Sequence, residues 1–326
     1  MQRRTLGNSD LHVSEVGLGC WQLGGDFGPI EAETVGAIIH TALSSDINFF
    51  DTADVYGDGA SEHFLGDHLG ALQPRPLIAT KYGRGGGAYP DGYSEAHMRD
   101  SVCRALERLQ IDTLDLLQLH CVPTEVMRDG AIFDWLRRLQ QEGHIRYFGA
   151  SVETVEEGLI CAEQEGITSL QVIFNTFRQK VVEELLPVAE ARNIGIIARL
   201  PLASGLLSGR FSEQSRFAES DHRHFNRDGA AFNVGETFAG IPFSTGVALV
   251  RELESRVPEG YTMAQMAMRW ILDQPAVSTI IPGASSPEQV RANAAVSDLP
   301  PLPEALHQAL TDFYHDKVKQ HIRGVY

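Results

Sequence analysis

The chain has 326 residues, of which 43% are hydrophobic and 21% charged, which is typical of a globular protein with a large core. A formal net charge of −16 repels a phosphate backbone, and no apolar run reaches the length of a membrane span, so we expect neither a nucleic-acid nor a membrane partner. No signal-peptide pattern follows Met1, and the four cysteines form no CxxC pair, which favours a cytoplasmic protein with free thiols and no metal site.

Short apolar, β-prone runs alternate with amphipathic stretches along the sequence. The runs begin near Val16, Asn48, Leu77, Leu114, Ile145, Ser169, Gly195 and Val277. Two of the intervening helices are predicted to begin with capping boxes, at Thr154 with Glu157 and at Thr262 with Gln265. Because the runs at 114–120 and 170–175 are apolar on both faces for most of their length, they favour a parallel sheet covered on both sides.

Eight consecutive βα units can close into a (β/α)8 barrel or lie as an open, doubly wound sheet. The open sheet of a dinucleotide-binding protein predicts a GxGxxG motif after the first strand, but residues 17–22 read Gly-Leu-Gly-Cys-Trp-Gln. No GxxxxGK[ST] phosphate loop occurs either. The sequence therefore favours an α/β fold of the TIM-barrel type, as a single domain over residues 1–326.

Two segments lie outside the repeating units. Residues 3–5 and 11–13 are β-prone and flank a turn-rich stretch, which predicts an N-terminal β-hairpin that plugs the lower mouth of the barrel. The seventh strand is followed by a long loop insertion, roughly residues 203–241, rich in Ser, Arg, His and Gly with scattered Phe. We expect this insertion to run over the upper face, where loops of such length usually bind ligands.

Ionisable residues at the carboxyl ends of the predicted strands indicate a candidate active site, because barrel enzymes build their sites at that face. Asp51 ends the second strand, Lys81 the third and His120 the fourth, while Tyr56 follows Asp51 by five residues. Strand alternation turns the three strand residues toward the same inward face. Singly, each residue fits a structural ion pair or wall equally well, but their conjunction favours catalysis.

The chemistry of these four residues is that of proton transfer to a carbonyl. Lys81, kept charged by Asp51, is expected to lower the pKa of Tyr56 toward a working range, and His120 can donate a hydrogen bond to a substrate oxygen. Protonation of an oxygen while hydride reaches its carbon is carbonyl reduction, and the reverse reaction needs the phenolate as base.

On these residues the chain resembles the aldo-keto reductase superfamily. The resemblance rests on Asp51 to Tyr56, read as Asp-Thr-Ala-x-x-Tyr, on the lysine of residues 78–81 and on the histidine of residues 117–120. It implies a (β/α)8 barrel that binds NADPH in extended form without a Rossmann motif. It also implies that Tyr56 is the general acid/base and that Asp51, Lys81 and His120 support it.

The same resemblance implies where the coenzyme lies. Ser151 and Gln171 match residues that hold the nicotinamide carboxamide, Arg199 replaces a stacking tyrosine, and Val152 replaces a frequent asparagine. The remaining contacts that it implies are Leu202 and Ser204 at the pyrophosphate and Gly283, Ser285, Gln289 and Asn293 at the adenosine end. The family usually binds NADP(H), with cations that hold its 2′-phosphate. Gly283 and Gln289 stand at those positions here, so both NADP(H) and NAD(H) stay open.

We expect an oxidoreductase that interconverts a small-molecule carbonyl (an aldehyde, ketone or sugar) and an alcohol with NAD(P)(H). Trp21, Tyr89 and residues 321–326 are candidate walls of its substrate pocket. The alternative is a coenzyme-binding regulatory subunit with little turnover, similar to the channel-associated β subunits of the family. Homo-oligomerisation stays open.

Overall fold

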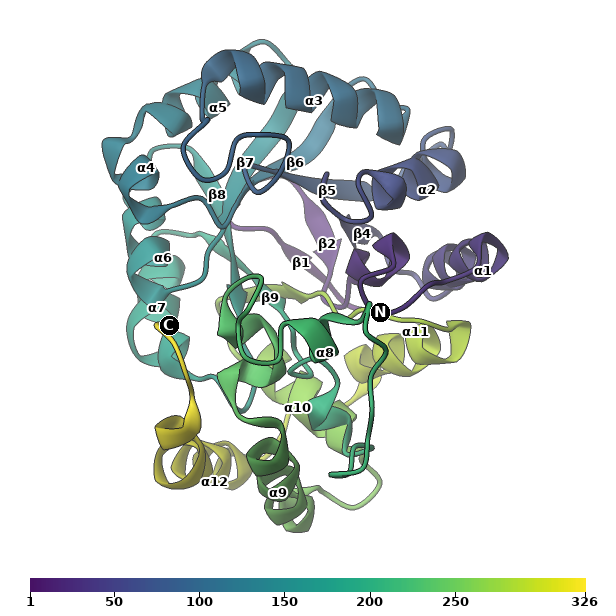
Figure 1. Cartoon of the computed structure of the whole chain (residues 1–326), viewed down its shortest axis with the longest axis vertical. Coiled ribbons are helices and arrows are strands. Elements are labelled where there is room, and N and C mark those ends of the chain that lie inside the picture. The colour runs from purple at the N-terminus through teal and green to yellow at the C-terminus, as the bar shows by residue number, and fades with distance from the viewer.

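The computed structural model describes residues 1–326 and contains eight parallel strands enclosed by helices (Figure 1). The strands are β3 (Leu18–Gly19), β4 (Phe49–Asp51), β5 (Leu77–Tyr82), β6 (Leu114–His120), β7 (Ile145–Ser151), β8 (Ile167–Ile173), β9 (Gly195–Arg199) and β10 (Val277–Ile280). Each strand pairs with the next one along the chain. All eight predicted strands are therefore present, close to their expected starts.

The two edge strands of this sheet meet and close it into a barrel. Val16 forms a parallel bridge with Ile280, and Gly19 forms one with Gly283. The amide of Gly17 donates to the carbonyl oxygen of Ile280 at 2.8 Å. Because closure pairs both edges, the backbone groups of the strands are satisfied within the barrel. The predicted (β/α)8 fold is confirmed.

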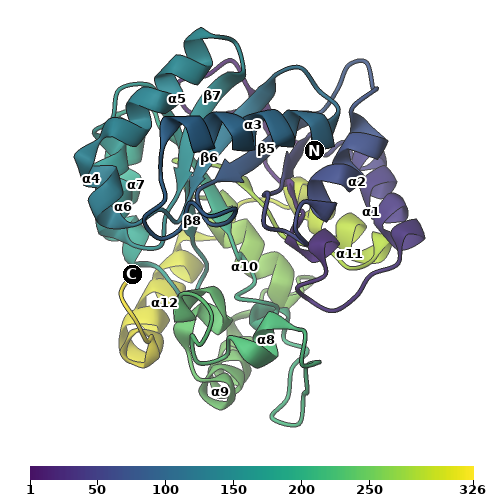
Figure 2. The ribbon, with the colours of Figure 1, turned by 45° about the horizontal axis from the view of Figure 1, so that its top comes forward.

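Helices cover the outer face of the barrel, and their apolar sides form one continuous core with the strands (Figures 1 and 2). They are α1 (Ala32–Ser44), α2 (Ala60–Leu69), α3 (Glu95–Leu109), α4 (Thr124–Asp129), α5 (Ala131–Gln141), α6 (Val155–Ala162), α7 (Lys180–Ala191), α9 (Phe243–Leu253), α10 (Met263–Leu272), α11 (Pro287–Ala294) and α12 (Glu304–Phe313). Both predicted capping boxes, at Thr154 and Thr262, are present. None of the helices combines the length and the apolar character that crossing a bilayer requires.

The N-terminal hairpin closes the lower end of the barrel, as predicted. Its strands, β1 (Arg3–Thr5) and β2 (His12–Ser14), are antiparallel. Hairpin and barrel interior share a buried apolar cluster of Leu6, Leu11, Val13, Phe49, Ala79, Leu116, Ile197 and Ile281. Burial of these side chains excludes water from the lower mouth and stabilises closure.

The insertion after β9 folds into short turns over the upper face. It contains the short helix α8 (His222–Phe225) and 3-10 turns at Leu206–Ser208, Val234–Glu236 and Phe238–Gly240. The amide of His222 donates to the carbonyl oxygen of Asp26 at 3.0 Å, which ties the insertion to the loop after β3. Figure 2 shows that it projects beyond the barrel on the side of α9.

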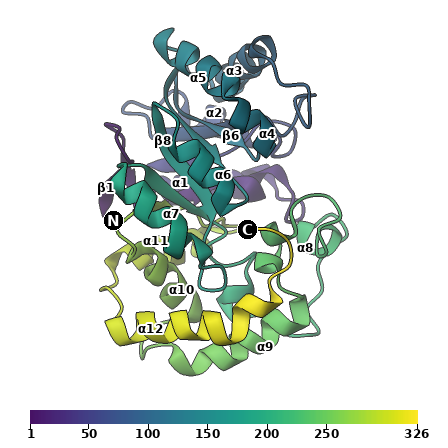
Figure 3. The same ribbon diagram turned by 90° about the vertical axis from the view of Figure 1, so that its left-hand side faces the viewer.

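The C-terminal residues hold the insertion from the other side. After α12, which runs beside α9 (Figure 3), the chain forms a π-helical turn at Tyr314–Val318 and a 3-10 turn at Lys319–His321. Nε of Arg323 donates to the carbonyl oxygen of Gly240 at 2.9 Å, and its Nη1 lies 2.6 Å from Asp228 Oδ1. The insertion is therefore anchored on two sides.

Candidate active site

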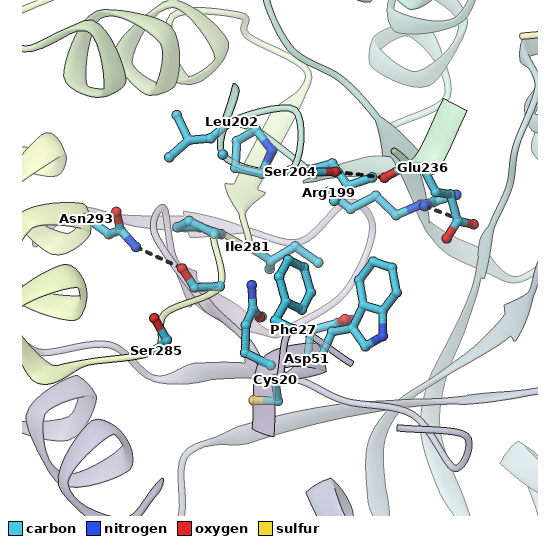
Figure 4. Close-up of a pocket in the computed structure, with 18 of the residues that line it drawn as sticks. Cys20, Phe27, Asp51, Arg199, Leu202, Ser204, Glu236, Ile281, Ser285 and Asn293 are labelled. Atoms are coloured by element: carbon cyan, nitrogen blue, oxygen red, sulfur yellow. Dashed lines mark hydrogen bonds and ion pairs between the residues drawn. The ribbon is translucent and has the colours of Figure 1, made fainter. Parts of the chain in front are cut away.

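A cavity of about 770 Å³ opens at the carboxyl ends of the strands and extends to the start of α11 (Figure 4). The predicted site residues that line it are Trp21, Asp51, Tyr56, His120, Ser151, Gln171, Arg199, Leu202, Ser204, Gly283, Ser285, Gln289 and Asn293. The structure thus brings together residues that are spread over most of the sequence.

Lys81 lies behind the cavity wall and connects the catalytic candidates. Its Nζ donates to Asp51 Oδ1 at 2.6 Å, to the carbonyl oxygen of Thr52 at 2.7 Å and to Tyr56 Oη at 3.2 Å. Asp51 Oδ2 accepts from the amides of Gln118 at 2.9 Å and Gln171 at 2.7 Å. Both buried charges are therefore paired and hydrogen-bonded, the condition under which burial of charge is tolerated.

Strand register explains why these residues meet. Asp51 pairs with Ala79, two residues before Lys81, and His120 pairs with Ser151 across β6 and β7. Phe49 and Ala79, each two residues before a candidate, belong to the apolar cluster inside the barrel. Because side chains alternate along a strand, the residue that follows by two also faces inward, at the upper rim.

The pKa of Tyr56 is shifted in the direction opposite to the expected one. Removal of the phenol from solvent raises the pKa of Tyr56 above its ordinary value, and the Lys81 ammonium, which acts in the opposite direction, does not outweigh it. The predicted lowered pKa is wrong for this reason. Desolvation also lowers the pKa of Lys81, but Asp51 and Tyr56 outweigh it and the net shift is upward. The pair therefore combines a neutral phenol with a charged ammonium near pH 7.

His120 is a neutral hydrogen-bond donor in this arrangement. Burial, together with the cations Arg84, Lys81 and Arg199, holds the pKa of His120 well below its usual value. Its Nδ1 is buried without a partner, and a buried N–H without an acceptor is costly, so the proton is assigned to Nε2. The ring lies 6.0 Å from the Tyr56 ring at an interplanar angle of 88°. Nε2–H and the Tyr56 hydroxyl can thus serve one substrate oxygen.

The residues expected at the nicotinamide form hydrogen bonds with one another and with the neighbouring backbone. Ser151 Oγ donates to Gln171 Oε1 at 3.2 Å. At Val152, where an asparagine is frequent, the carbonyl oxygen accepts from Arg199 Nη2 at 3.3 Å. Nε of Arg199 is buried and has no partner. An unpaired donor in a cavity wall is suited to a bound polar group.

The residues expected at the adenosine end lie on α11 and on the loop before it. Ser286 caps this helix and Pro287 is its first residue, as predicted. Gln289 Oε1 accepts from the amide of Ser285 at 2.8 Å, while Asn293 Nδ2 donates to the carbonyl oxygen of Gly283 at 3.4 Å. These groups are neutral, and Arg291 is paired with Glu288 at 2.8 Å. With a helix N-terminus at one end and proton donors at the other, the cavity fits an extended dinucleotide.

Sequence reasoning allowed a salt bridge at Arg199 but missed the other members of an ionic network near His120. Arg84 Nη1 lies 2.9 Å and Arg199 Nη1 3.4 Å from Glu236 Oε1, and Arg84 Nη2 lies 3.9 Å from Glu153 Oε1. Cys121, Glu153 and Glu236 could each offer one metal-ligand atom, all within 4.8 Å. Because both carboxylates are paired with arginines, we interpret the cluster as an ion-pair network. Arg84 and Glu153 each lie two residues after the end of a strand and could have been found there, whereas Glu236 carries no sequence signal.

The sequence predicts three features as walls of the substrate pocket. Trp21 lines the cavity, whereas Tyr89 and residues 321–326 lie elsewhere. The Trp21 ring stacks on Tyr56 at 6.0 Å, and its Nε1 donates to Asp26 at 2.7 Å. Tyr89 is 56% exposed and does not line the cavity, because its neighbour Ala88 is the residue that packs inward. Residues 321–326 do not line it either, since Arg323 bonds to the insertion and the carbonyl oxygen of Tyr326 accepts from Lys180 on α7. Phe27 and Phe232 line the cavity in their place.

Comparison with known proteins places this geometry in context. A sequence model of the Aldo/keto reductase family matches residues 15–315. The uncharacterized oxidoreductase YqkF of Bacillus subtilis is 32% identical over 316 residues, 95% of each chain. An L-galactose dehydrogenase of Arabidopsis thaliana is 30% identical over 92% of this chain and 89% of that protein. A probable voltage-gated potassium channel subunit beta of the same plant is 28% identical over 99% and 97%.

Solved structures resemble the chain over its whole length. The glycerol dehydrogenase of Gluconobacter oxydans superposes with a TM-score of 0.80 at 28% identity, covering 100% of this chain and 98% of that one. The holo form of an aldo-keto reductase from Bacillus halodurans gives a TM-score of 0.78 at 28% identity, with the same coverage.

Proposed function

The chain belongs to the aldo/keto reductase family, and from this we propose that it interconverts a small-molecule carbonyl and its alcohol with a nicotinamide coenzyme. The observation that carries the proposal is the 3.2 Å contact between Lys81 Nζ and Tyr56 Oη at the inner end of the cavity. This contact combines a neutral proton donor with a fixed cation that stabilises the phenolate formed once the proton has left.

The coenzyme, when bound, supplies or accepts the hydride. In the direction of reduction, Tyr56 donates its proton to the carbonyl oxygen while His120 Nε2–H donates a hydrogen bond to the same oxygen. Lys81 stabilises the phenolate, and Asp51 holds the ammonium in place. In the direction of oxidation, the Tyr56 phenolate accepts the proton of the alcohol.

The residues that would hold the coenzyme follow the cavity from end to end. Ser151 and Gln171 would bind the carboxamide, Arg199 would lie at the nicotinamide, and Leu202 and Ser204 would contact the pyrophosphate. The adenosine end would rest on Gly283, Ser285, Gln289 and Asn293. Because Gly283 and Gln289 offer no cation for a 2′-phosphate, we propose that the chain uses NADH as well as NADPH.

The substrate would lie between Tyr56 and the aromatic walls Trp21, Phe27 and Phe232. Arg84, which also lines this part of the cavity, adds hydrogen-bond donors to these apolar surfaces. The combination of flat rings and polar groups suits small hydroxylated carbonyl compounds, and the two related dehydrogenases are named for glycerol and L-galactose. Aldehydes, ketones and sugars are therefore the first substrates to test.

The test is turnover measured as absorbance at the nicotinamide band. Purified protein is mixed with NADH or NADPH and a panel of aldehydes, ketones and sugars, and with the oxidised coenzymes and alcohols. Turnover of at least one pair is expected. A second candidate, a coenzyme-binding regulatory subunit, is supported by the likeness to a potassium channel subunit. Saturable coenzyme binding without turnover of any pair would favour that alternative.

A further inference from the structure

Glu236 is the residue through which the insertion enters the ionic network of the cavity. It lies in the turn Val234–Glu236, whereas Arg84, Glu153 and Arg199 follow or end the barrel strands β5, β7 and β9. Figure 4 shows Glu236 beside Arg199 at one side of the cavity. Arg84, Arg199 and Glu236 line the cavity together with His120 and Ser151. The network thus borders the end where the nicotinamide is proposed to lie.

The charges of this network balance only when Glu236 is ionised. Glu236 Oε1 accepts a hydrogen bond from Arg84 Nη1 at 2.9 Å and forms an ion pair with Arg199 Nη1 at 3.4 Å. Glu153 lies farther from Arg84, at 3.9 Å, and also accepts from Asn233 Nδ2 at 3.1 Å. Desolvation raises the pKa of Glu236, but the two arginines outweigh it and the net shift is downward. Its carboxylate is therefore charged at neutral pH.

A fixed charge at this position distinguishes the two forms of a nicotinamide coenzyme. The oxidised ring is cationic and the reduced ring is neutral, so an uncompensated cation nearby disfavours the oxidised form alone. The Lys81 and Asp51 charges already neutralise each other at 2.6 Å. The net charge near the nicotinamide ring consequently depends on Arg84 and Arg199 against Glu153 and Glu236.

We propose that Glu236 is a positioning residue that sets the relative affinity for oxidised and reduced coenzyme, because its carboxylate, together with that of Glu153, balances the charges of Arg84 and Arg199 beside the nicotinamide. This inference rests on the proposed function, since it requires the coenzyme in this cavity. It assigns to the insertion an electrostatic role in addition to covering the site.

The test is the ratio of the dissociation constants of oxidised and reduced coenzyme, measured by titration of protein fluorescence without any substrate. In Glu236→Gln the oxidised form is expected to bind on the order of tenfold more weakly relative to the reduced form. Arg84→Gln removes a cation from the same network and is expected to shift the ratio in the opposite direction. The double variant should return close to the wild-type ratio.

Glu156→Gln is the matched control, because it makes the same chemical change at an exposed residue of α6 outside the cavity. Its ratio should equal that of the wild type. Equal weakening of both forms in Glu236→Gln and in Arg84→Gln would overturn the inference and leave Glu236 with a purely structural role. If the wild-type chain binds both forms and the ratio stays unchanged in the variants, only this inference fails. Should the wild type bind neither form, the proposed function fails with it.

Discussion

Asp51, Tyr56 and Lys81 lie at the inner end of the cavity, at the rim of a closed barrel, whereas Ser285 and Gln289 lie exposed at the first turns of α11. The inner end holds opposite charges in a desolvated network whose partners come from several strands and from the loop after β4. The outer end offers neutral side chains that bond mainly to their own helix and loop.

This difference indicates how each end responds to change. A group within a desolvated network interacts strongly with its neighbours, so its loss alters proton transfer or stability by large factors. A solvent-exposed side chain exchanges its partners for water at little cost, so its replacement changes affinity modestly. The four predictions below test this contrast, in order of decreasing effect.

Tyr56→Phe removes the proposed proton donor at the inner end and retains the ring. Turnover is expected to fall by a factor on the order of 10³, since general acid catalysis contributes about 10²–10⁴-fold. The dissociation constant of the coenzyme should change by less than about twofold, because no proton is transferred on binding. The matched control is Tyr261→Phe, whose hydroxyl contacts the carbonyl oxygen of Pro300 outside the cavity and whose loss should leave turnover unchanged. Equal loss of turnover and affinity would assign Tyr56 to binding instead.

Lys81→Met tests how much the inner network contributes to the free energy of unfolding. The variant leaves Asp51 buried without its cation, which is expected to lower the free energy of unfolding by about 3–5 kcal/mol. Urea denaturation followed by circular dichroism measures the loss. At the outer end Gln289→Ala should cost less than about 1 kcal/mol, and similar losses for both variants would contradict the contrast. Adding Asp51→Asn to Lys81→Met should restore part of the stability.

The pH dependence follows from the raised pKa of Tyr56. Below that pKa the phenol is protonated, so carbonyl reduction should be constant through neutral pH and fall only in the alkaline range. Alcohol oxidation requires the phenolate, whose fraction rises about tenfold per pH unit below the pKa, so its rate should rise likewise. Steady-state rates in both directions between pH 6 and about 10 measure these slopes. A plateau of oxidation already near neutrality would mean that Lys81 outweighs desolvation after all.

Gln289→Arg places a cation at the outer end. We expect the preference for NADPH over NADH to rise by about threefold to fivefold, because an exposed ion pair contributes little. The ratio of kcat/KM for the two coenzymes with one carbonyl substrate measures the change. An unchanged ratio would place the adenosine elsewhere than at α11.

The inner end could be predicted from the sequence because strand alternation and strand order are local properties. Asp51, Lys81 and His120 each end an apolar run, and register alone brings them together. The sign of the Tyr56 pKa shift could not be predicted, since it depends on how far the surrounding loops exclude water. Glu236 and Phe232 reach the cavity through an insertion without periodicity, and no spacing rule identifies them. Tyr89 was misplaced because neighbouring residues in a loop can face opposite ways.

The apolar plug formed by Leu6, Leu11 and Val13 has a consequence for proton traffic. The side chains of that cluster cannot relay a proton, so the cluster gives Tyr56 no path to bulk water. In the proposed reduction, the proton that Tyr56 gives to the product is replaced through the upper opening, by which the product itself departs. Reprotonation of the phenolate and release of the product therefore use the same opening. A product that stays bound there delays both steps.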